Sequence, residues 1–281
     1  MDFTRANDLI EKVEKSLKEI AEFNRTEELL VGVDLGTAYI VLVVLDKNMN
    51  PIASEMQFAQ VIRDGLVVDY IGASRIVREL KEKLEKRLGK ELLKAAIAVP
   101  PGTSERDSKT HKYVVEGAGM EVTAILDEPT AANAVLGIEN GVIVDIGGGT
   151  TGLSILKKGE VIYTADEATG GTHLSLVISG NYKITFEEAE KIKKDKKRQR
   201  EIFTVVRPVV QKMATIVKNH IEGYDVEDIY LVGGTCCLEK IEEVFEKEIG
   251  IRTTKPKNPF LVTPLGIAMN CRIEGSDINE Y

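Results

Sequence analysis

Two apolar segments that each end in an Asp and a glycine turn constrain this chain more than any other feature. Residues 141–152 read Gly-Val-Ile-Val-Asp-Ile-Gly-Gly-Gly-Thr-Thr-Gly. The β-branched run Val142, Ile143 and Val144 is typical of a strand that is covered on both faces. The three glycines that follow let the backbone turn sharply and bring its N–H groups close to an anion. The segment therefore predicts a strand that runs into a phosphate-binding loop.

An Asp at the junction adds a chemical requirement. The carboxylate of Asp145 repels phosphate, so it fits the loop if a divalent cation with its water lies between them. Thr150 and Thr151 add hydroxyl groups within reach of phosphate oxygens. The structural alternative is that Asp145 only bonds to the backbone of its own turn.

The same pattern occurs near the front of the chain. Residues 29–38 read Leu-Leu-Val-Gly-Val-Asp-Leu-Gly-Thr-Ala, and an apolar strand resumes after each loop, at residues 39–45 and 153–156. Each repeat is therefore a β-hairpin and not a P-loop that leads into a helix. Two such loops in one chain indicate a duplicated domain whose loops hold one polyphosphate together.

Length and composition exclude several classes of protein. The 281 residues suffice for two domains, and a net charge of −8 argues against nonspecific nucleic-acid binding. No apolar run approaches the length of a membrane span, and the N-terminus does not resemble a signal peptide. We expect a cytoplasmic protein that binds neither nucleic acid nor membrane.

The cysteines agree with a reducing compartment. Their number is odd, and Cys236 and Cys237 are adjacent while Cys271 is distant. No second CxxC motif or histidine cluster supplies further ligands, so they do not predict a metal site.

An amphipathic helix is expected at residues 3–23. Leu9, Val13, Leu17 and Ile20 recur at three- and four-residue spacing with Glu and Lys between them. Two interpretations are open: the helix packs on the body of the protein, or it docks a partner.

The rest of the chain alternates strands and helices. Strands are expected at residues 52–59, 95–99, 122–126, 161–168, 229–232 and 251–254. Helices are expected at residues 71–88, 103–118, 173–179, 185–197, 203–224, 238–249 and 263–270. The basic run at residues 193–200 is either a solvated helix end or a contact for an acidic partner or nucleotide phosphates.

Six segments occur in the order typical of one superfamily. They are residues 34–37, 128–132, 145–150, 170–171, 189–193 and 232–235. In this order they resemble the actin-like ATPase superfamily, which includes the DnaK-type chaperones, MreB and FtsA, over residues 29–272. Within it, the chain looks most like the EutJ family, DnaK-like proteins of ethanolamine-utilisation operons.

The resemblance implies an α/β protein with the actin-like, ribonuclease H-like fold. Two duplicated βββαβα lobes would bind ATP and Mg²⁺ in a nucleotide cleft. The implied organisation is an N-terminal amphipathic helix at residues 1–26, lobe I at 27–140, lobe II at 141–274 and a polar tail at 275–281.

The resemblance also implies a role for each motif residue. Contacts to the phosphates fall to Gly36, Thr37, Ala38, Gly147, Gly148, Gly149 and Thr150. The residues implied at the ribose and adenine are Gly170, Gly171, Glu190, Lys193, Gly233, Gly234 and Thr235. Gly170 and Gly171 would also lie near the phosphates. Asp34 and Asp145 would hold Mg²⁺ through water. Glu128 would orient or deprotonate the attacking water.

Structural alternatives exist for several of these residues. Glu128 could be a helix-start residue that favours the helix dipole. Glu190 could be a solvated helix charge, and the turn at Gly233 and Gly234 could be structural only.

Three departures from the DnaK pattern predict weak ATP binding and slow hydrolysis. No Lys matches the one that contacts phosphate from the first lobe, and only Arg63 lies in the corresponding region. Cys237 stands where the chaperones stack an Arg on adenine, and Phe260 replaces an acidic residue after Asn-Pro.

The expected function is that of a Mg²⁺-dependent ATPase whose lobe closure changes its grip on a client protein. The EutJ resemblance implies a chaperone-like role toward ethanolamine ammonia-lyase or microcompartment shell proteins, without a DnaK-type peptide-binding domain. The alternatives are a filament-forming cytoskeletal protein, a sugar or acetate kinase, and a nucleotide-binding scaffold without turnover.

Overall fold

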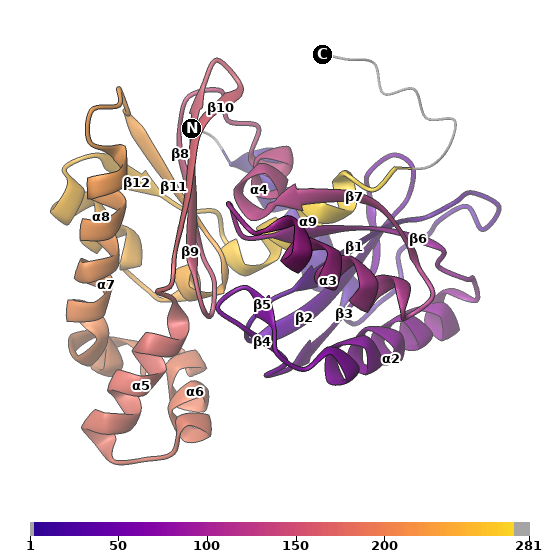
Figure 1. Ribbon diagram of the computed structural model, residues 1–281, viewed down its shortest axis with the longest axis horizontal. Helices are drawn as coiled ribbons and strands as arrows, with labels where there is room; N and C mark the ends of the chain where they lie inside the picture. Colours follow the sequence, from indigo (N-terminus) through magenta and orange to yellow (C-terminus); the bar gives the residue numbers. More distant parts are fainter. Residues whose placement is uncertain (1–2, 273–281) are drawn as a thin grey trace. The chain divides into compact units, whose positions relative to one another are not determined.

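The computed structural model describes residues 3–272 and contains two five-stranded sheets. The chain divides into two compact units (Figure 1). The first unit takes in the chain up to Leu136 and again from Leu261 onwards, and the second runs from Gly137 to Phe260. The predicted polar tail at 275–281 lies outside the described residues.

The sheet of the first unit has the strand order β3-β2-β1-β6-β7. Its strands are β1 (Leu30–Leu35), β2 (Tyr39–Leu45), β3 (Pro51–Phe58), β6 (Lys94–Val99) and β7 (Glu121–Asp127). β1, β2 and β3 are antiparallel, whereas β6 and β7 run parallel to β1. A small separate hairpin consists of β4 (Ile62–Arg63) and β5 (Leu66–Val67). The predicted strand–loop–strand unit at the front of the chain is confirmed.

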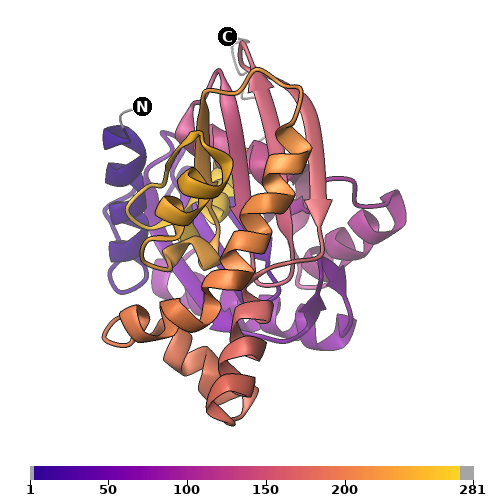
Figure 2. The same ribbon diagram turned by 90° about the vertical axis from the view of Figure 1, so that its left-hand side faces the viewer.

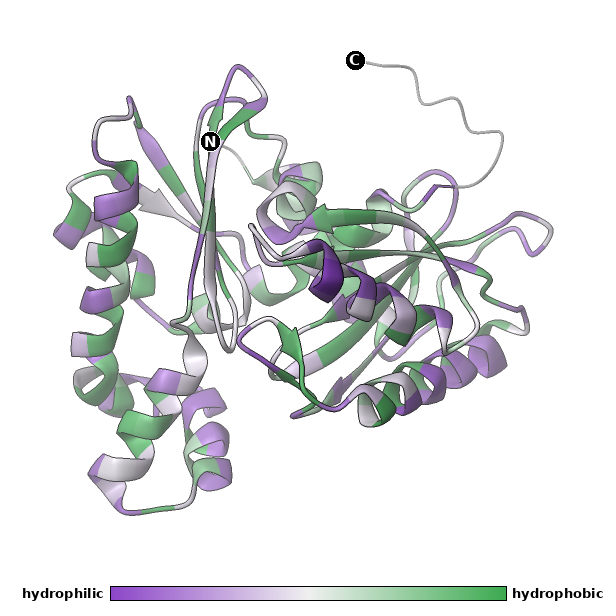
Figure 3. Ribbon diagram, in the orientation of Figure 1, coloured by the Kyte–Doolittle hydropathy of each residue, from purple (hydrophilic) through white to green (hydrophobic). Residues whose placement is uncertain are grey.

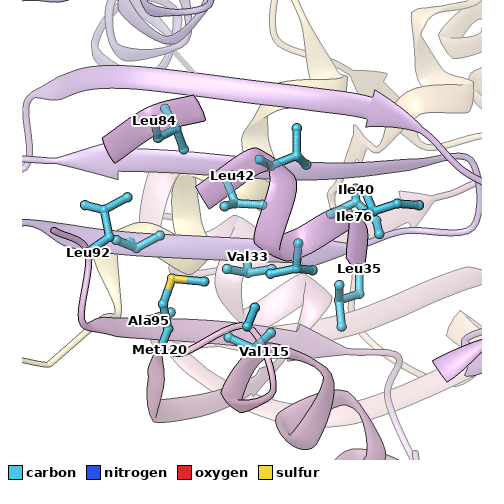
Figure 4. Close-up of a cluster of buried hydrophobic side chains, with 14 of the residues drawn as sticks. Val33, Leu35, Ile40, Leu42, Ile76, Leu84, Leu92, Ala95, Val115 and Met120 are labelled. Carbon is cyan, nitrogen blue, oxygen red and sulfur yellow. The ribbon is translucent and has the colours of Figure 1, made fainter. Parts of the chain in front are cut away.

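Two helices, α2 (Tyr70–Leu88) and α3 (Glu105–Glu116), pack on one face of this sheet. Side chains alternate along β1, so Val33 and Leu35 point into the core that these helices cover (Figure 4). In α2 hydrophobic and hydrophilic residues recur along the ribbon, as expected for a helix with one buried face (Figure 3). It begins where Asp69 accepts the N–H of Gly72 at 2.9 Å.

The other face of the sheet carries α9 (Val262–Met269), which packs on β1 and on α4 (Glu128–Leu136). Two glycines permit this close approach. A methyl group on Gly32 would lie 2.4 Å from the backbone nitrogen of Ala268, and one on Gly266 would lie 1.8 Å from the carbonyl oxygen of Ala131.

The placement of α9 corrects the expected division of the chain, which assigned residues up to 274 to the second lobe. The helix belongs to the first unit. All residues of α9 before Met269 are buried, so the helix presents no polar face to solvent. Its apolar pattern indicates burial but contains no information on which core receives it.

The N-terminal helix α1 (Thr4–Ser16) packs on the first unit through Ala6, Ile10 and Val13. This agrees with the first of the two interpretations. The helix is shorter than predicted because its end is anchored to the sheet. The hydroxyl groups of Ser16 and Ser54 lie 2.7 Å apart, and Arg87 donates to the Ser16 carbonyl at 2.9 Å.

The second unit repeats the topology of the first, with the strand order β10-β9-β8-β11-β12. Its strands are β8 (Gly141–Ile146), β9 (Thr151–Lys157), β10 (Glu160–Glu167), β11 (Asp228–Val232) and β12 (Arg252–Thr254). β8, β9 and β10 are antiparallel, while β11 runs parallel to β8 and β12 parallel to β11. The predicted duplication is therefore present.

The helices of the second unit are α5 (Gly171–Tyr182), α6 (Phe186–Lys194), α7 (Gln199–Ile221) and α8 (Ile241–Ile249). Figure 2 shows the long helix α7 in front of the sheet. Val206, Val210 and Met213 of α7 are fully buried in the same core as β8. Within residues 3–272, no helix combines the length and the apolarity that a membrane span requires.

Candidate functional site

The glycine loop after β8 is tied to two other parts of the second unit. The N–H of Gly147 donates to the Thr150 carbonyl at 3.0 Å, which closes the turn. The Gly147 carbonyl accepts from the N–H of Gly171 at 3.0 Å and from the hydroxyl of Thr235 at 2.7 Å. The loop is thus held against the start of α5 and the turn after β11.

The loop keeps backbone donors for a ligand. Among residues 3–272, no backbone hydrogen bond engages the N–H of Gly148 or Gly149. The Gly148 carbonyl, by contrast, accepts from the Thr172 N–H at 2.8 Å. The loop therefore uses carbonyl groups to hold its shape, and donors of the kind that bind phosphate remain.

Three of the glycines that were predicted to contact the nucleotide pack too closely against their neighbours to carry a side chain. A methyl group on Gly170 would lie 2.7 Å from the Gly148 carbonyl oxygen, and one on Gly171 would lie 2.5 Å from Thr235 Oγ1. Gly233 has a φ of +91°, and a methyl group there would lie 2.3 Å from Asp145 Oδ1. The turn at Gly233 therefore has a structural role whether or not it contacts a ligand.

Asp145 lies near the end of β8, and its carboxylate lies next to the turn after β11. The residue is only 5% exposed. Burial raises the pKa of the neighbouring Cys236 thiol well above its usual value, and the charge of Asp145 adds to this effect. Both effects favour the neutral thiol form of Cys236. Among residues 3–272, no three His, Cys, Asp or Glu side chains gather as a metal site.

Glu190 and Lys193 form a buried ion pair on α6. Lys193 Nζ donates to the Gly171 carbonyl at 2.9 Å and to Ser175 Oγ at 2.8 Å, and it also binds Glu190 directly. Lys194 contacts the other carboxylate oxygen of Glu190 at 3.1 Å. Burial alone would raise the pKa of Glu190, but Lys193, Ser175 and Lys194 outweigh it and hold the pKa below its usual value. Glu190 is therefore not a solvated helix charge.

The aromatic ring of Phe260 packs on the turn at Gly233 and Gly234. The sequence did not predict this contact. A methyl group on Gly234 would lie 3.2 Å from the Phe260 ring, and the Gly233 N–H donates to the Pro259 carbonyl at 3.0 Å. Cys237 is exposed, with its sulfur 3.7 Å from Asn258 Oδ1. The segment that departs from the DnaK pattern thus packs on a predicted ligand-binding turn.

The first unit holds the other predicted loop, at Gly36, Thr37 and Ala38. A methyl group on Gly36 would lie 2.8 Å from the Tyr39 carbonyl oxygen, so this turn also requires glycine. The Ala38 carbonyl accepts from the Ala59 N–H at 3.1 Å. Asp34 is half-buried at the end of β1.

Glu128 is the first residue of α4, directly after β7. The neighbouring Asp127 caps the helix, because it accepts the N–H and the hydroxyl of Thr130 at 2.8 and 2.7 Å. β1, β6 and β7 are parallel, so the end of β1, where Asp34 lies, and the end of β7, which Glu128 follows, are at the same edge of the sheet. Glu128 is not required as the helix cap.

The structure therefore places the predicted residues in two sets. The second unit brings together Asp145, Gly147, Gly148, Gly149, Thr150, Gly170, Gly171, Glu190, Lys193, Gly233, Gly234 and Thr235. The first unit contains Asp34, Gly36, Thr37, Ala38 and Glu128. Their contacts with ATP and Mg²⁺ remain predictions.

The chain is similar in sequence to known proteins over most of its length. The chain is 45% identical over 245 residues to the ethanolamine utilization protein EutJ of Escherichia coli K12, and the match covers 87% of this chain and 86% of that protein. The chain belongs to the EutJ family. The crystal structure of EutJ from Carboxydothermus hydrogenoformans agrees, with 50% identity, a TM-score of 0.90 and coverage of 96% of this chain and 99% of that one.

More distant matches place the EutJ family among the actin-like ATPase folds. A family model described as "Type IV pilus assembly protein PilM" matches residues 110–271. MreB5 of Spiroplasma citri, solved bound to ADP, is 18% identical with a TM-score of 0.70, and the match covers 86% of this chain and 95% of that chain. At this identity the likeness shows the fold alone. The predicted fold class and family are confirmed.

Proposed function

We propose that this EutJ-family protein binds Mg²⁺–ATP and hydrolyses it slowly in ethanolamine utilisation. One observation carries the proposal. The loop at Gly147, the start of α5 at Gly171 and the turn at Thr235 are joined by direct hydrogen bonds that leave the backbone N–H groups of Gly148 and Gly149 unused within residues 3–272. Backbone N–H groups in such a cradle suit phosphate oxygens.

Magnesium would neutralise charge on the phosphates when bound. In this proposal Asp34 and Asp145 each offer hard carboxylate oxygens of the kind that hold Mg²⁺ through water. Each lies near the end of the central strand of its own sheet. In this proposal Glu128 orients or deprotonates the attacking water, as phosphoryl transfer to water requires.

Slow turnover follows from the residues present. Arg63 of the hairpin β4–β5 is the cation in the region where DnaK proteins carry a phosphate-binding Lys. Lys193 is already bound to Glu190, Ser175 and the Gly171 carbonyl, so its charge is largely neutralised. The site therefore has fewer cations than the DnaK pattern provides to stabilise charge on the transferred phosphoryl group.

Family membership supports a role in ethanolamine utilisation. Relatives at 45% and 50% identity carry the name ethanolamine utilization protein EutJ. We propose a chaperone-like role in which ATP binding changes the affinity for a client, with ethanolamine ammonia-lyase or microcompartment shell proteins as the candidate clients. A pull-down in each nucleotide state tests this role, and recovery of neither client in any state would contradict it.

A filament-forming ATPase is the second candidate, supported by the likeness in fold to MreB5. Sedimentation at high protein concentration separates the two. ATP-dependent pelleting would favour a filament, whereas a constant sedimentation coefficient with ATP and magnesium would exclude it.

Calorimetric titration of ATP, with and without magnesium, tests the primary proposal. We expect magnesium-dependent binding by the wild type and its loss in Asp145→Asn, which keeps the size of the side chain. Asp225→Asn is the matched control, because Asp225 is an exposed Asp of the same unit. No binding by the wild type at millimolar ATP would overturn the proposal and leave a scaffold without nucleotide.

A further inference from the structure

The Lys193 ammonium group uses all three of its hydrogen-bond donors within the protein. It donates to the Gly171 carbonyl at 2.9 Å, to Ser175 Oγ at 2.8 Å and to the Glu190 carboxylate. The family resemblance implies that Lys193 contacts the ribose and adenine. Such a contact would require the loss of one of these bonds, whereas a role that acts through the Gly171 carbonyl keeps all three.

The Gly171 carbonyl belongs to a peptide group that reaches the glycine loop. A trans peptide is planar, and its C=O and N–H point in opposite directions. The N–H of this peptide is that of Thr172, which donates to the Gly148 carbonyl at 2.8 Å. Lys193 therefore holds one end of a peptide group whose other end holds the loop.

The same geometry recurs within the loop, because the Gly148 carbonyl shares its peptide with the N–H of Gly149. Among residues 3–272, no backbone hydrogen bond engages that N–H, which suits it to bind phosphate. Donors and acceptors thus run in one direction, from the Lys193 ammonium through two peptide groups to the Gly149 N–H. We call this series of groups the Lys193 relay.

Each step of the Lys193 relay strengthens the next. A cation on a carbonyl polarises its peptide, so the N–H of that peptide becomes a stronger donor. Burial lowers the pKa of Lys193, but the adjacent Glu190 carboxylate counteracts this effect and favours the ammonium form. Glu190 accepts from Lys193 and from the Ser175 hydroxyl. The Gly171 carbonyl therefore meets the positive end of the ion pair.

We propose that Lys193 is a positioning residue of the phosphate site, which orients and polarises the Gly149 N–H through the relay and does not touch the nucleotide. This inference rests on the proposed binding of ATP, and it assigns Lys193 to the phosphates instead of the ribose and adenine. Ser175, which the sequence did not indicate, supports the arrangement, because its fully buried hydroxyl accepts from Lys193 and donates to Glu190.

Titrations with inorganic tripolyphosphate, adenosine and ATP, each with magnesium, distinguish the relay from a direct contact. In Lys193→Met, Glu190 keeps Ser175 and Lys194 as partners. We expect the affinities for tripolyphosphate and ATP to fall by the same factor, about tenfold, and that for adenosine to stay unchanged. Weaker adenosine binding with unchanged tripolyphosphate binding would show a direct contact and overturn the proposal.

Two further variants make the titrations decisive. Lys194→Met is the matched control, because Lys194 binds the other oxygen of the same carboxylate at 3.1 Å and its side chain is 41% exposed. It should change tripolyphosphate affinity by less than about twofold. Lys193→Met/Glu190→Gln, compared with Glu190→Gln alone, repeats the test without an unpaired carboxylate and should show the same tenfold loss.

Amide proton chemical shifts test the relay without any ligand. In Lys193→Met the Thr172 amide proton should move upfield because its peptide is less polarised, and that of Gly149 should follow. Both should stay in place in Lys194→Met. Unchanged shifts in Lys193→Met would contradict the relay even if the protein binds ATP. The expected shifts in a protein that binds no ATP would support the relay and contradict the proposed ATPase.

Discussion

The Thr235 hydroxyl donates to the Gly147 carbonyl at 2.7 Å, although 88 residues separate the two in sequence. This bond fixes the turn after β11 against the loop after β8. Gly171 lies beside it, because a methyl group there would lie 2.5 Å from Thr235 Oγ1. Three segments that are distant in sequence therefore depend on one another for their positions.

Two glycines of helix α5 should respond to alanine with opposite sign. Gly171→Ala would push Thr235 away from Gly147, and we expect it to lower the free energy of unfolding by about 1–3 kcal/mol. Gly180→Ala should raise it by roughly 0.5–1 kcal/mol, because nothing lies within 4 Å of that position and alanine favours the helix. Chemical denaturation measures both, and a shared sign would contradict the geometry.

Alanine variants at two glycines with positive φ distinguish the cost of backbone strain from the cost of a steric clash. Gly233 and Gly223 have φ values of +91° and +86°, but only Gly233 has neighbours within 4 Å, the nearest being Asp145. Gly223→Ala should cost about 1 kcal/mol from backbone strain alone. Gly233→Ala should cost at least about 3 kcal/mol and weaken nucleotide binding. Equal melting temperatures of the two variants would show that the turn can relax.

The buried pair on α6 should make stability sensitive to acid. The folded-state pKa of Glu190 lies below its unfolded value, so its contribution is present above about pH 4.3 and is lost as the pH falls through the lowered pKa. Glu190→Gln leaves the Lys193 charge buried, and we expect a loss of roughly 3 kcal/mol at pH 7. The difference from wild type should shrink in acid, which denaturant melts at several pH values would record.

An exposed pair supplies the control for that measurement. Lys240 and Glu243 have the same three-residue separation, at 3.8 Å, but both side chains are more than 60% exposed. Glu243→Gln should change stability by less than about 0.5 kcal/mol at any pH, because water screens the pair. An equal effect of the two substitutions would show that Glu190 is solvated after all.

Alanine at Gly266 should disrupt the first unit severely. In most helices this change stabilises, but here the added methyl group would lie 1.8 Å from the Ala131 carbonyl oxygen. Backbone cannot give way as a side chain can, so we expect a loss of more than about 3 kcal/mol. Hydrogen exchange should rise in α4 and α9 while α7 keeps its protection. Unchanged exchange in α4 would show that α9 docks less closely.

Much of the architecture follows from short patterns in the sequence. The apolar run before Asp145 and the glycines after it predicted β8, its turn and β9, because strand alternation and glycine turns are local features. Two copies of that pattern predicted the duplication of the sheet. Gly171, Lys193 and Thr235 were expected near one ligand, and the structure places them in contact.

The missed features all depend on contacts between distant segments. Nothing near Gly266 indicates that α9 packs on α4, because an apolar helix suits any core. The end of α1 at Ser16 depends on Ser54 and Arg87, which are remote in sequence. The contact of the Phe260 ring with Gly234 could not be predicted either. The sequence showed only that Phe260 stands where the DnaK pattern has an acidic residue.

The return of α9 to the first unit affects the order in which the protein can fold during synthesis. Residues 137–260 are contiguous, so the second unit can complete its core as soon as they leave the ribosome. The first unit, although most of it is translated earlier, lacks the helix that covers β1 until translation reaches Met269. We therefore expect the nascent chain to expose one apolar face of its first sheet through most of its synthesis, and cotranslational chaperones to bind there.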